Sequence, residues 1–283
     1  MISITLKKKA WRIPDRWGEL TPADGPRFVA MSSAMASFEE GLITFDEFRV
    51  RLTLAAAGIR KVPEITDTMA ENVYRLSELL TYPYRLSERP DGSRVAEIDV
   101  VLSENLLPEL HRVAGYRFHR DPSGKMDCSL TAEQYIDALS LLQAHRATRQ
   151  PSALQDLVRV LYPGVKGVTP DEARAVAYNF RGILAWIRSI PSYALIFATE
   201  ETASAPAKNP VGLAASVYTL AKAGYGSIAE VKGLPLFGYL DLLLQQTVES
   251  IRTLAASKLT PTKIAERLAL PTDLICDYIP AQP

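Results

Sequence analysis

The chain is poor in the residue types that most often ligate metals or act as nucleophiles. Its 283 residues include two cysteines and three histidines. Cys128 and Cys276 lie far apart and have no metal-ligand spacing, which argues against a disulfide-stapled secreted domain and favours a reducing compartment. We interpret both as buried or incidental thiols. The composition therefore predicts neither a disulfide framework nor a metal site built on cysteine.

An excess of charge of one sign is also missing. Lysine plus arginine and aspartate plus glutamate number 32 each, so the formal net charge is zero. No long-range field then draws the chain to nucleic acid or to an anionic membrane, and we expect neither as a partner. Residues 1–10 lack the apolar stretch of a signal peptide, and no run approaches the length of a membrane span. These absences predict a cytoplasmic protein.

What the chain has instead is a repeated helix-start phrase. A Leu-Thr pair stands at Leu20-Thr21 and again at Leu130-Thr131. The threonine hydroxyl can accept from the free amides of a first helical turn, and Gln134 follows Thr131 by three residues, where a capping box has Glu or Gln. Such phrases specify helices rather than chemistry, so the sequence predicts architecture better than activity.

Hydrophobic periodicity predicts a mainly α fold with two small β parts. Alternation over residues 2–6 and a return strand over 10–13 predict an N-terminal hairpin. Strand patterns at 95–102 and 116–119 predict a small sheet near 95–120, packed on helices. Helical spacing and caps predict helices over residues 21–41, 44–58, 67–80, 135–147, 153–161, 169–190, 212–223, 227–232, 237–256 and 261–268, and one further short helix after them.

A polar segment divides this pattern into two domains. Residues 200–210 are rich in Ala, Glu, Ser, Thr and Pro and contain no large apolar side chain, which is typical of a solvated linker. We predict an N-terminal domain over 1–199, containing the hairpin and the small sheet, a linker over 200–210, and a helical C-terminal domain over 211–283.

One stretch matches the letters of a cofactor-binding motif. Residues 224–229, Gly-Tyr-Gly-Ser-Ile-Ala, fit the dinucleotide fingerprint, but that motif works at a strand-to-helix turn and a helical pattern precedes this copy. We interpret Gly224 as a helix stop and Ser227 as the next helix cap. The sequence predicts no catalytic residue, no metal site and no cofactor.

Two other classes of function stay open. An enzyme with a dispersed site would use residues around the predicted sheet, and would need at least two of them within hydrogen-bond reach; the candidates are Asp99, Glu104, His111 and His119. A nucleic-acid-binding regulator would use residues 258–279, which have the outline of a helix-turn-helix. The second helix there offers Asp273 and Asp277 and no basic residue, so we favour a packing motif.

Three patches carry a resemblance to a known class of protein. They are Ile13 to Thr21, which follows the predicted hairpin, Leu130 to Ala138, and Val160 to Pro163. Together they resemble proteins of bacteriophage tail modules, of the tail-assembly chaperone or baseplate-assembly type. Pro22 and the Gly25-Pro26 pair depart from the more usual aromatic start of the first helix in that class.

The resemblance implies a non-enzymatic protein that acts in tail or virion assembly through protein–protein contacts. A chaperone would shield apolar surfaces of a tail protein until polymerisation, and a structural component would be incorporated in the virion. The implied partners are tail or baseplate proteins in the host cytoplasm, and a homo-oligomer stays open. The contact residues would come from an apolar run, Phe237, Tyr239, Leu240, Leu243 and Leu244, unless that run is the core helix of the C-terminal domain.

Overall fold

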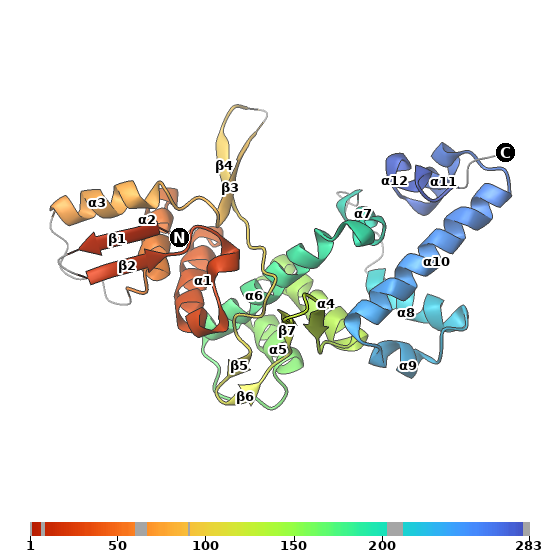
Figure 1. The fold of residues 1–283 in the computed structure, drawn as a ribbon, viewed down its shortest axis with the longest axis horizontal. Coiled ribbons are helices and arrows are strands. Elements are labelled where there is room, and N and C mark those ends of the chain that lie inside the picture. The colour runs from red at the N-terminus through yellow and green to blue at the C-terminus, as the bar shows by residue number, and fades with distance from the viewer. Residues whose placement is uncertain (1, 7–8, 60–66, 90, 203–211, 280–283) are drawn as a thin grey trace. The chain divides into compact units, whose positions relative to one another are not determined.

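The computed structural model describes residues 2–6, 9–59, 67–89, 91–202 and 212–279 (Figure 1). The fold is mainly α with small two-stranded antiparallel hairpins, which confirms the fold-class prediction. By its internal contacts the chain divides into two compact units. Unit 1 comprises residues 1–127 and 140–185, and unit 2 comprises 128–139 and 186–283.

The predicted linker falls mostly outside the described ranges. Helix α7, Ala194–Thr202, extends into its first three positions, so these are helical. Residues 203–211 are not among those described. The division into domains 1–199 and 211–283 therefore stays a prediction.

Unit 1 begins with the expected hairpin and a helical pair. β1 (Ile2–Leu6) pairs antiparallel with β2 (Lys9–Ile13), and Ile2 lies opposite Ile13. The first Leu-Thr phrase opens a single 3-10 turn rather than the long helix, because Thr21 precedes η2 (Pro22–Asp24) and α1 (Gly25–Glu39) starts after it. η1 covers Trp17–Glu19.

Three helices form the N-terminal part of the unit 1 core. α2 (Phe45–Ala56) packs on α1, and α3 (Asp67–Ser77) packs on α2. The side chains of α1 and α2 that are fully or almost fully buried include Phe28, Met31, Met35, Phe48 and Leu52. Phe28 and Phe48 are the aromatic members of this set, and both are fully buried.

The predicted small sheet is replaced by three separate hairpins. Their strands are β3 (Tyr84–Glu88) with β4 (Arg94–Ile98), β5 (Glu109–Leu110) with β6 (Val113–Ala114), and β7 (Phe118–Arg120) with β8 (Met126–Cys128). The strand predicted over 95–102 ends at Ile98. It pairs with β3 and not with residues 116–119. Val100 and Leu102 are buried without strand pairing, and both would meet a Cβ added at Gly182 at 2.8 Å.

Buried amide side chains replace sheet hydrogen bonds in the irregular segment between β4 and β7. Asn105 Nδ2 donates to the carbonyl of Tyr116 (2.7 Å), and Asn105 Oδ1 accepts from the amide of Leu107 (2.9 Å). Asn179 of α6 (Pro170–Arg188) accepts from the amide of Leu106 (3.0 Å) and donates to Asn105 Oδ1 (2.6 Å). These bonds satisfy buried backbone groups that have no ladder, which buried polar groups require.

The remaining helices lie close to their predicted ranges. They are α4 (Ala132–Thr148), α5 (Pro151–Leu161), α6, α8 (Gly212–Lys222), α9 (Ile228–Gly233), α10 (Leu236–Ala256), α11 (Pro261–Leu268) and α12 (Thr272–Cys276), with η3 at Pro191–Tyr193. Thr131 and Gln134 form the predicted capping box at the start of α4 (3.1 and 3.2 Å). The interpretation of the glycine-rich stretch is also confirmed: Gly224 has φ +92° just after α8, and Ser227 caps α9.

Unit 2 has its own apolar core. α7, α11 and α12 contribute to one buried cluster with the C-terminal half of α10; the buried members are Leu195, Ala198, Ile251, Ile264, Ala265, Leu270 and Ile275. An isolated β-bridge between Thr131 and Pro235 joins the start of α4 to the start of α10. In the described ranges no helix is both long and apolar enough to cross a bilayer.

Candidate protein-binding surface

An aromatic cluster formed by α1 and α2 fixes the base of the β3–β4 hairpin. The rings of Phe38 and Phe48 stack with centroids 4.7 Å apart. Tyr84, the first residue of β3, meets Phe45 edge-on at 5.0 Å and Phe48 at 6.0 Å. Edge-to-face aromatic pairs contribute stability in addition to that from their buried area. The hairpin is therefore held on the helices at Tyr84.

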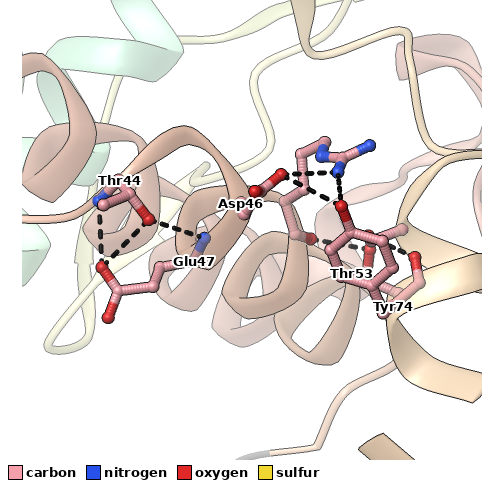
Figure 2. A network of polar contacts seen from close by, with 7 residues as sticks. Thr44, Asp46, Glu47, Thr53 and Tyr74 are labelled. Carbon is pink, nitrogen blue, oxygen red and sulfur yellow. Dashed lines mark hydrogen bonds and ion pairs between the residues drawn. The ribbon is translucent and has the colours of Figure 1, made fainter. Parts of the chain in front are cut away.

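Arg49 joins α2 to α3 by bonding Asp46 and Tyr74, which are labelled in Figure 2. Its Nη2 donates to Asp46 Oδ1 (2.7 Å) and to the Tyr74 hydroxyl (3.0 Å), and its guanidinium lies 5.1 Å from the Tyr74 ring centroid. Burial alone would lower the pKa of Arg49, but the hydrogen bonds with Asp46 and Tyr74 outweigh it and raise the pKa. The cation thus stays charged, stacked and hydrogen bonded, which sets the position of α3.

The start of α2 is set by a capping box, also visible in Figure 2. The Thr44 amide donates to Glu47 Oε2 (2.9 Å), and the Glu47 amide donates to Thr44 Oγ1 (3.3 Å). The backbone hydrogen bond from Thr44 is the main reason that the pKa of Glu47 is lowered. Leu42, in the turn before this box, is 70% exposed.

Beyond its base, the hairpin extends away from the helices of unit 1 (Figure 1). Leu86 lies on the same face as Tyr84, because residues of a strand alternate between faces, and it is opposite Ala96. Tyr84 is 8% exposed, whereas Leu86 is 55% exposed. One sheet face therefore runs from the buried base to an open apolar patch.

The strand edges of this hairpin are open as well. β3 and β4 form a two-stranded sheet, so in the described part of the chain neither outer edge pairs with a third strand. An unpaired edge presents a row of backbone donors and acceptors to another strand. We define the hairpin surface as Leu86, Ala96 and the outer edges of β3 and β4. It combines an exposed apolar side chain with free backbone hydrogen-bonding groups.

The residues expected to bind a partner lie mostly inside unit 2. Tyr239, Leu240 and Leu243 are 0%, 0% and 7% exposed, and the Tyr239 hydroxyl is 2.6 Å from Ser216 Oγ. Phe237 and Leu244 are half-buried, and the Phe237 ring stacks on Tyr193 at 6.3 Å. This placement matches the alternative that the run is a core helix. A partner-binding role for these residues stays a prediction, and Tyr239, Leu240 and Leu243 have almost no exposed surface with which to contact a partner.

The four residues of the enzyme alternative have separate partners. Asp99 pairs with Arg85, His111 bonds the Lys166 carbonyl and Glu172 (2.9 Å each), and His119 lies 3.9 Å from Asp127. Glu104, the fourth, is half-buried. No hydrogen bond or ion pair joins any two of these four described residues, so the structure does not bring the candidate acid–base group together.

The geometry at His111 favours the doubly protonated imidazolium form. Both acceptors, the Lys166 carbonyl and the Glu172 carboxylate, face ring nitrogens, so both bonds form only when each nitrogen carries a proton. The backbone bond with Lys166 is the largest cause that raises the pKa of His111, followed by Glu172. His111 therefore ties the β5–β6 turn to the start of α6.

The C-terminal helices pack as the sequence interpretation expects. Thr260 Oγ1 accepts from the Lys263 amide (3.5 Å) at the start of α11, and Ala269 turns the chain with φ +54°. Ile264 and Ile275 are fully buried in the unit 2 cluster, whereas Asp273 and Asp277 are exposed. An exposed acidic second helix is poorly suited to a phosphate backbone.

In the described part of the chain no metal centre forms a further site, and no similar protein indicates one. The described ranges contain no group of three His, Cys, Asp or Glu side chains placed to hold a metal ion. Cys276 is exposed and Cys128 is half-buried, so neither is a fully buried thiol, and of our two interpretations the incidental one is left for both. Comparison with protein-family models, curated proteins and solved structures found no match.

The hairpin surface was missed at the level of sequence, although a signal for it exists. Residues 84–88 alternate in character, and Asp91-Gly92 is typical turn chemistry between two strands. In the structure Gly92 has φ +79° and Asp91 Oδ1 accepts from the Ser93 amide (2.8 Å). The prediction paired β4 with a later strand and so overlooked β3.

Proposed function

We propose that this chain is a non-enzymatic assembly protein of a bacteriophage or prophage tail, and that it acts through protein–protein contacts as a chaperone or as a built-in component. The observation that carries the proposal is the hairpin surface, where Leu86 is 55% exposed beside unpaired strand edges. The resemblance of residues 13–21, 130–138 and 160–163 to tail-module proteins gives the class of partner. The site of action is the host cytoplasm or the virion.

The mode of contact follows from the chemistry of the surface. A strand of a tail or baseplate protein adds to the edge of β3 or β4, with backbone hydrogen bonds giving affinity. Leu86 and Ala96 receive an apolar side chain of that strand. The hairpin thereby covers a partner surface that would otherwise aggregate before polymerisation.

A substitution at Leu86 tests the proposal in the phage or prophage that encodes the chain. Leu86→Asp places a charge on the apolar face and leaves the buried base of the hairpin intact. Leu42→Asp is the matched control, because Leu42 is also an exposed leucine of unit 1. Tailed particles are counted by negative-stain electron microscopy, and circular dichroism checks that both variants fold.

We expect far fewer tailed particles with Leu86→Asp and wild-type numbers with Leu42→Asp. Equal numbers from both variants would contradict the role of the hairpin surface. Tailed particles at wild-type numbers after deletion of the gene would contradict the proposed function itself.

A further inference from the structure

The register of the β3–β4 hairpin decides which backbone groups its outer edges leave open. Along an antiparallel pair, residues that exchange hydrogen bonds alternate with residues whose backbone groups point outward. The Asp99 amide donates to the Pro83 carbonyl (2.9 Å) at one end of the ladder, and the Arg89 amide donates to the Ser93 carbonyl (2.8 Å) at the other. The odd-numbered residues of β3 therefore bond inward to β4, and the even-numbered residues, such as Leu86, point their N–H and C=O groups outward.

The outer edge of β3 is the more accessible of the two edges. Its outward residues are Tyr84, Leu86 and Glu88, and the Tyr84 amide already donates to the Thr81 carbonyl (3.4 Å). Within the described ranges no hydrogen bond occupies the outward backbone groups of Leu86 and Glu88, and both residues are exposed. Ala96, the central outward residue of β4, is half-buried. An incoming strand therefore finds its open donors and acceptors chiefly on β3.

The β3 edge is complementary to a second copy of itself. In a two-fold symmetric antiparallel pair, one residue lies opposite its own counterpart. When the Leu86 residues of the two copies lie opposite each other, each uses both its outward groups to bond the other. Glu88 of each copy then lies opposite Tyr84 of the other copy, and its amide can donate to the Tyr84 carbonyl. The groups left open on one strand thus meet their complements on the other.

The charges of β3 select this register among its neighbours. A shift of two residues in one direction places Arg85 opposite Arg85 of the other copy, and a shift in the other direction places Arg85 opposite Arg89. Like charges directly opposite each other destabilise a sheet. With Leu86 at the centre, Arg85 lies opposite the neutral Ser87 and keeps its ion pair with Asp99.

The same register covers the exposed apolar side chain of the hairpin. Opposite residues of a ladder lie on the same sheet face, so the two Leu86 side chains, each 55% exposed in the single chain, contact each other. A two-stranded hairpin is marginal by itself, whereas a sheet of more strands with an apolar face is stable. Two five-residue strands bury less than the ~1,200 Å² of a stable complex, so the pairing is weak and depends on concentration.

We propose that the β3 edge binds a second copy of this chain by symmetric antiparallel pairing centred on Leu86, which joins the two hairpins in a four-stranded sheet. One face of that sheet carries Leu86 and Ala96 of both copies. The proposal goes beyond the tail-assembly function and does not rest on it. It assigns the β3 edge to self-association and leaves the β4 edge for a tail protein.

Proline substitutions test which edge is used, with the full chain studied by analytical ultracentrifugation from ~1 μM to ~1 mM. Glu88→Pro removes an outward amide of β3, and proline is tolerated in an edge strand where the N–H faces away from the ladder. Ala96→Pro is the matched control, because it removes an outward amide of β4. Circular dichroism checks that both variants fold.

A disulfide tests the register. The Cα atoms of a hydrogen-bonded antiparallel pair lie ~5.5 Å apart, within the ~4.4–6.8 Å that a disulfide spans. Leu86→Cys is made in a chain whose own thiols are removed by Cys128→Ser and Cys276→Ser, and it is oxidised under mild conditions. Leu42→Cys in the same background is the control, because Leu42 is also an exposed leucine of unit 1.

We expect a monomer–dimer equilibrium whose dissociation constant rises at least about tenfold in Glu88→Pro and is unchanged in Ala96→Pro. We also expect a disulfide-linked dimer with Leu86→Cys and none with Leu42→Cys. A chain that is monomeric over the whole concentration range, equal weakening by both proline variants, or equal cross-linking of both cysteine variants would overturn the proposal. Tailed-particle numbers do not enter this readout, so self-association can fail while the assembly function stands.

Discussion

Gly182 and Gly238 both lie inside helices but have opposite surroundings. A Cβ at Gly182 in α6 would come within 2.8 Å of Val100 and Leu102, whereas a Cβ at Gly238 in α10 would meet nothing within 4 Å. We expect Gly182→Ala to lower the free energy of unfolding by about 1–3 kcal/mol, because the close packing of α6 on the β4–β5 segment is lost.

Gly238→Ala should instead raise the free energy of unfolding by about 0.5–1 kcal/mol, since alanine loses less conformational entropy in a helix than glycine. Urea denaturation followed by circular dichroism measures both variants. If both substitutions changed the free energy of unfolding in the same direction, the close contacts of Gly182 with Val100 and Leu102 would not explain its effect.

His111 makes stability depend on pH. Its pKa is raised above the ordinary value of 6.5, first by the Lys166 carbonyl and then by Glu172. Burial would raise the pKa of Glu172, but hydrogen bonds from the Thr169 backbone and from His111 lower it, so the carboxylate stays charged in mildly acidic solution. The contribution of His111 is therefore fully present below pH 6.5 and is lost as the pH rises through the raised value.

His111→Asn tests this dependence, because asparagine tolerates φ +50° and does not titrate. The difference in unfolding free energy between wild type and variant should be largest between about pH 5 and 6 and should shrink above the raised pKa. A difference that is constant across pH 5–9 would contradict the imidazolium bridge. Titration of the histidine ring signals by NMR gives the pKa directly.

At the scale of elements, α2 depends on its capping box. Thr44→Ala removes the oxygen that accepts from the Glu47 amide and should lower the free energy of unfolding by about 1 kcal/mol. Thr44→Ser keeps the oxygen and is the control, with little change expected. The two variants are compared by urea denaturation, and equal stability of both would mean that the cap contributes nothing to α2.

The helices were predictable because their signals are local. The box at Thr131 and Gln134, the stop at Gly224 and the cap at Ser227 each lie within a few residues of the feature that they set, so the sequence alone places them. The first Leu-Thr phrase shows the limit, since Thr21 opens a 3-10 turn and α1 begins four residues later.

Strand pairing was less predictable because an alternating run by itself fits more than one partner strand. β4 pairs with β3 through register contacts such as Leu86 with Ala96, and nothing in residues 95–102 alone distinguishes that partner from residues 116–119. By contrast, Asn105 and Asn179 lie 74 residues apart in sequence, so their hydrogen bond has no local signature. The candidate surface does have a local signal, the Asp91-Gly92 turn that leads β4 back to β3, and it was missed because that turn was overlooked.

At the scale of the molecule, burial decides which apolar residues can bind a partner. The run from Phe237 to Leu244 suggested a contact surface, but Tyr239 and Leu240 are fully buried in unit 2. Periodicity describes a helix with a wide apolar face and does not tell how many neighbours cover it. The extent of unit 1 is equally hard to predict from sequence, because the unit consists of two separate stretches of chain, 1–127 and 140–185.

The central claim is that the chain works by binding proteins of a phage tail. Affinity purification of the tagged chain from its native host, followed by mass spectrometry and light scattering of the eluted complex, tests this claim most directly. We predict tail or baseplate proteins at a defined stoichiometry with the wild-type chain and their loss with Leu86→Asp. A chain that elutes alone as a monomer would contradict the claim.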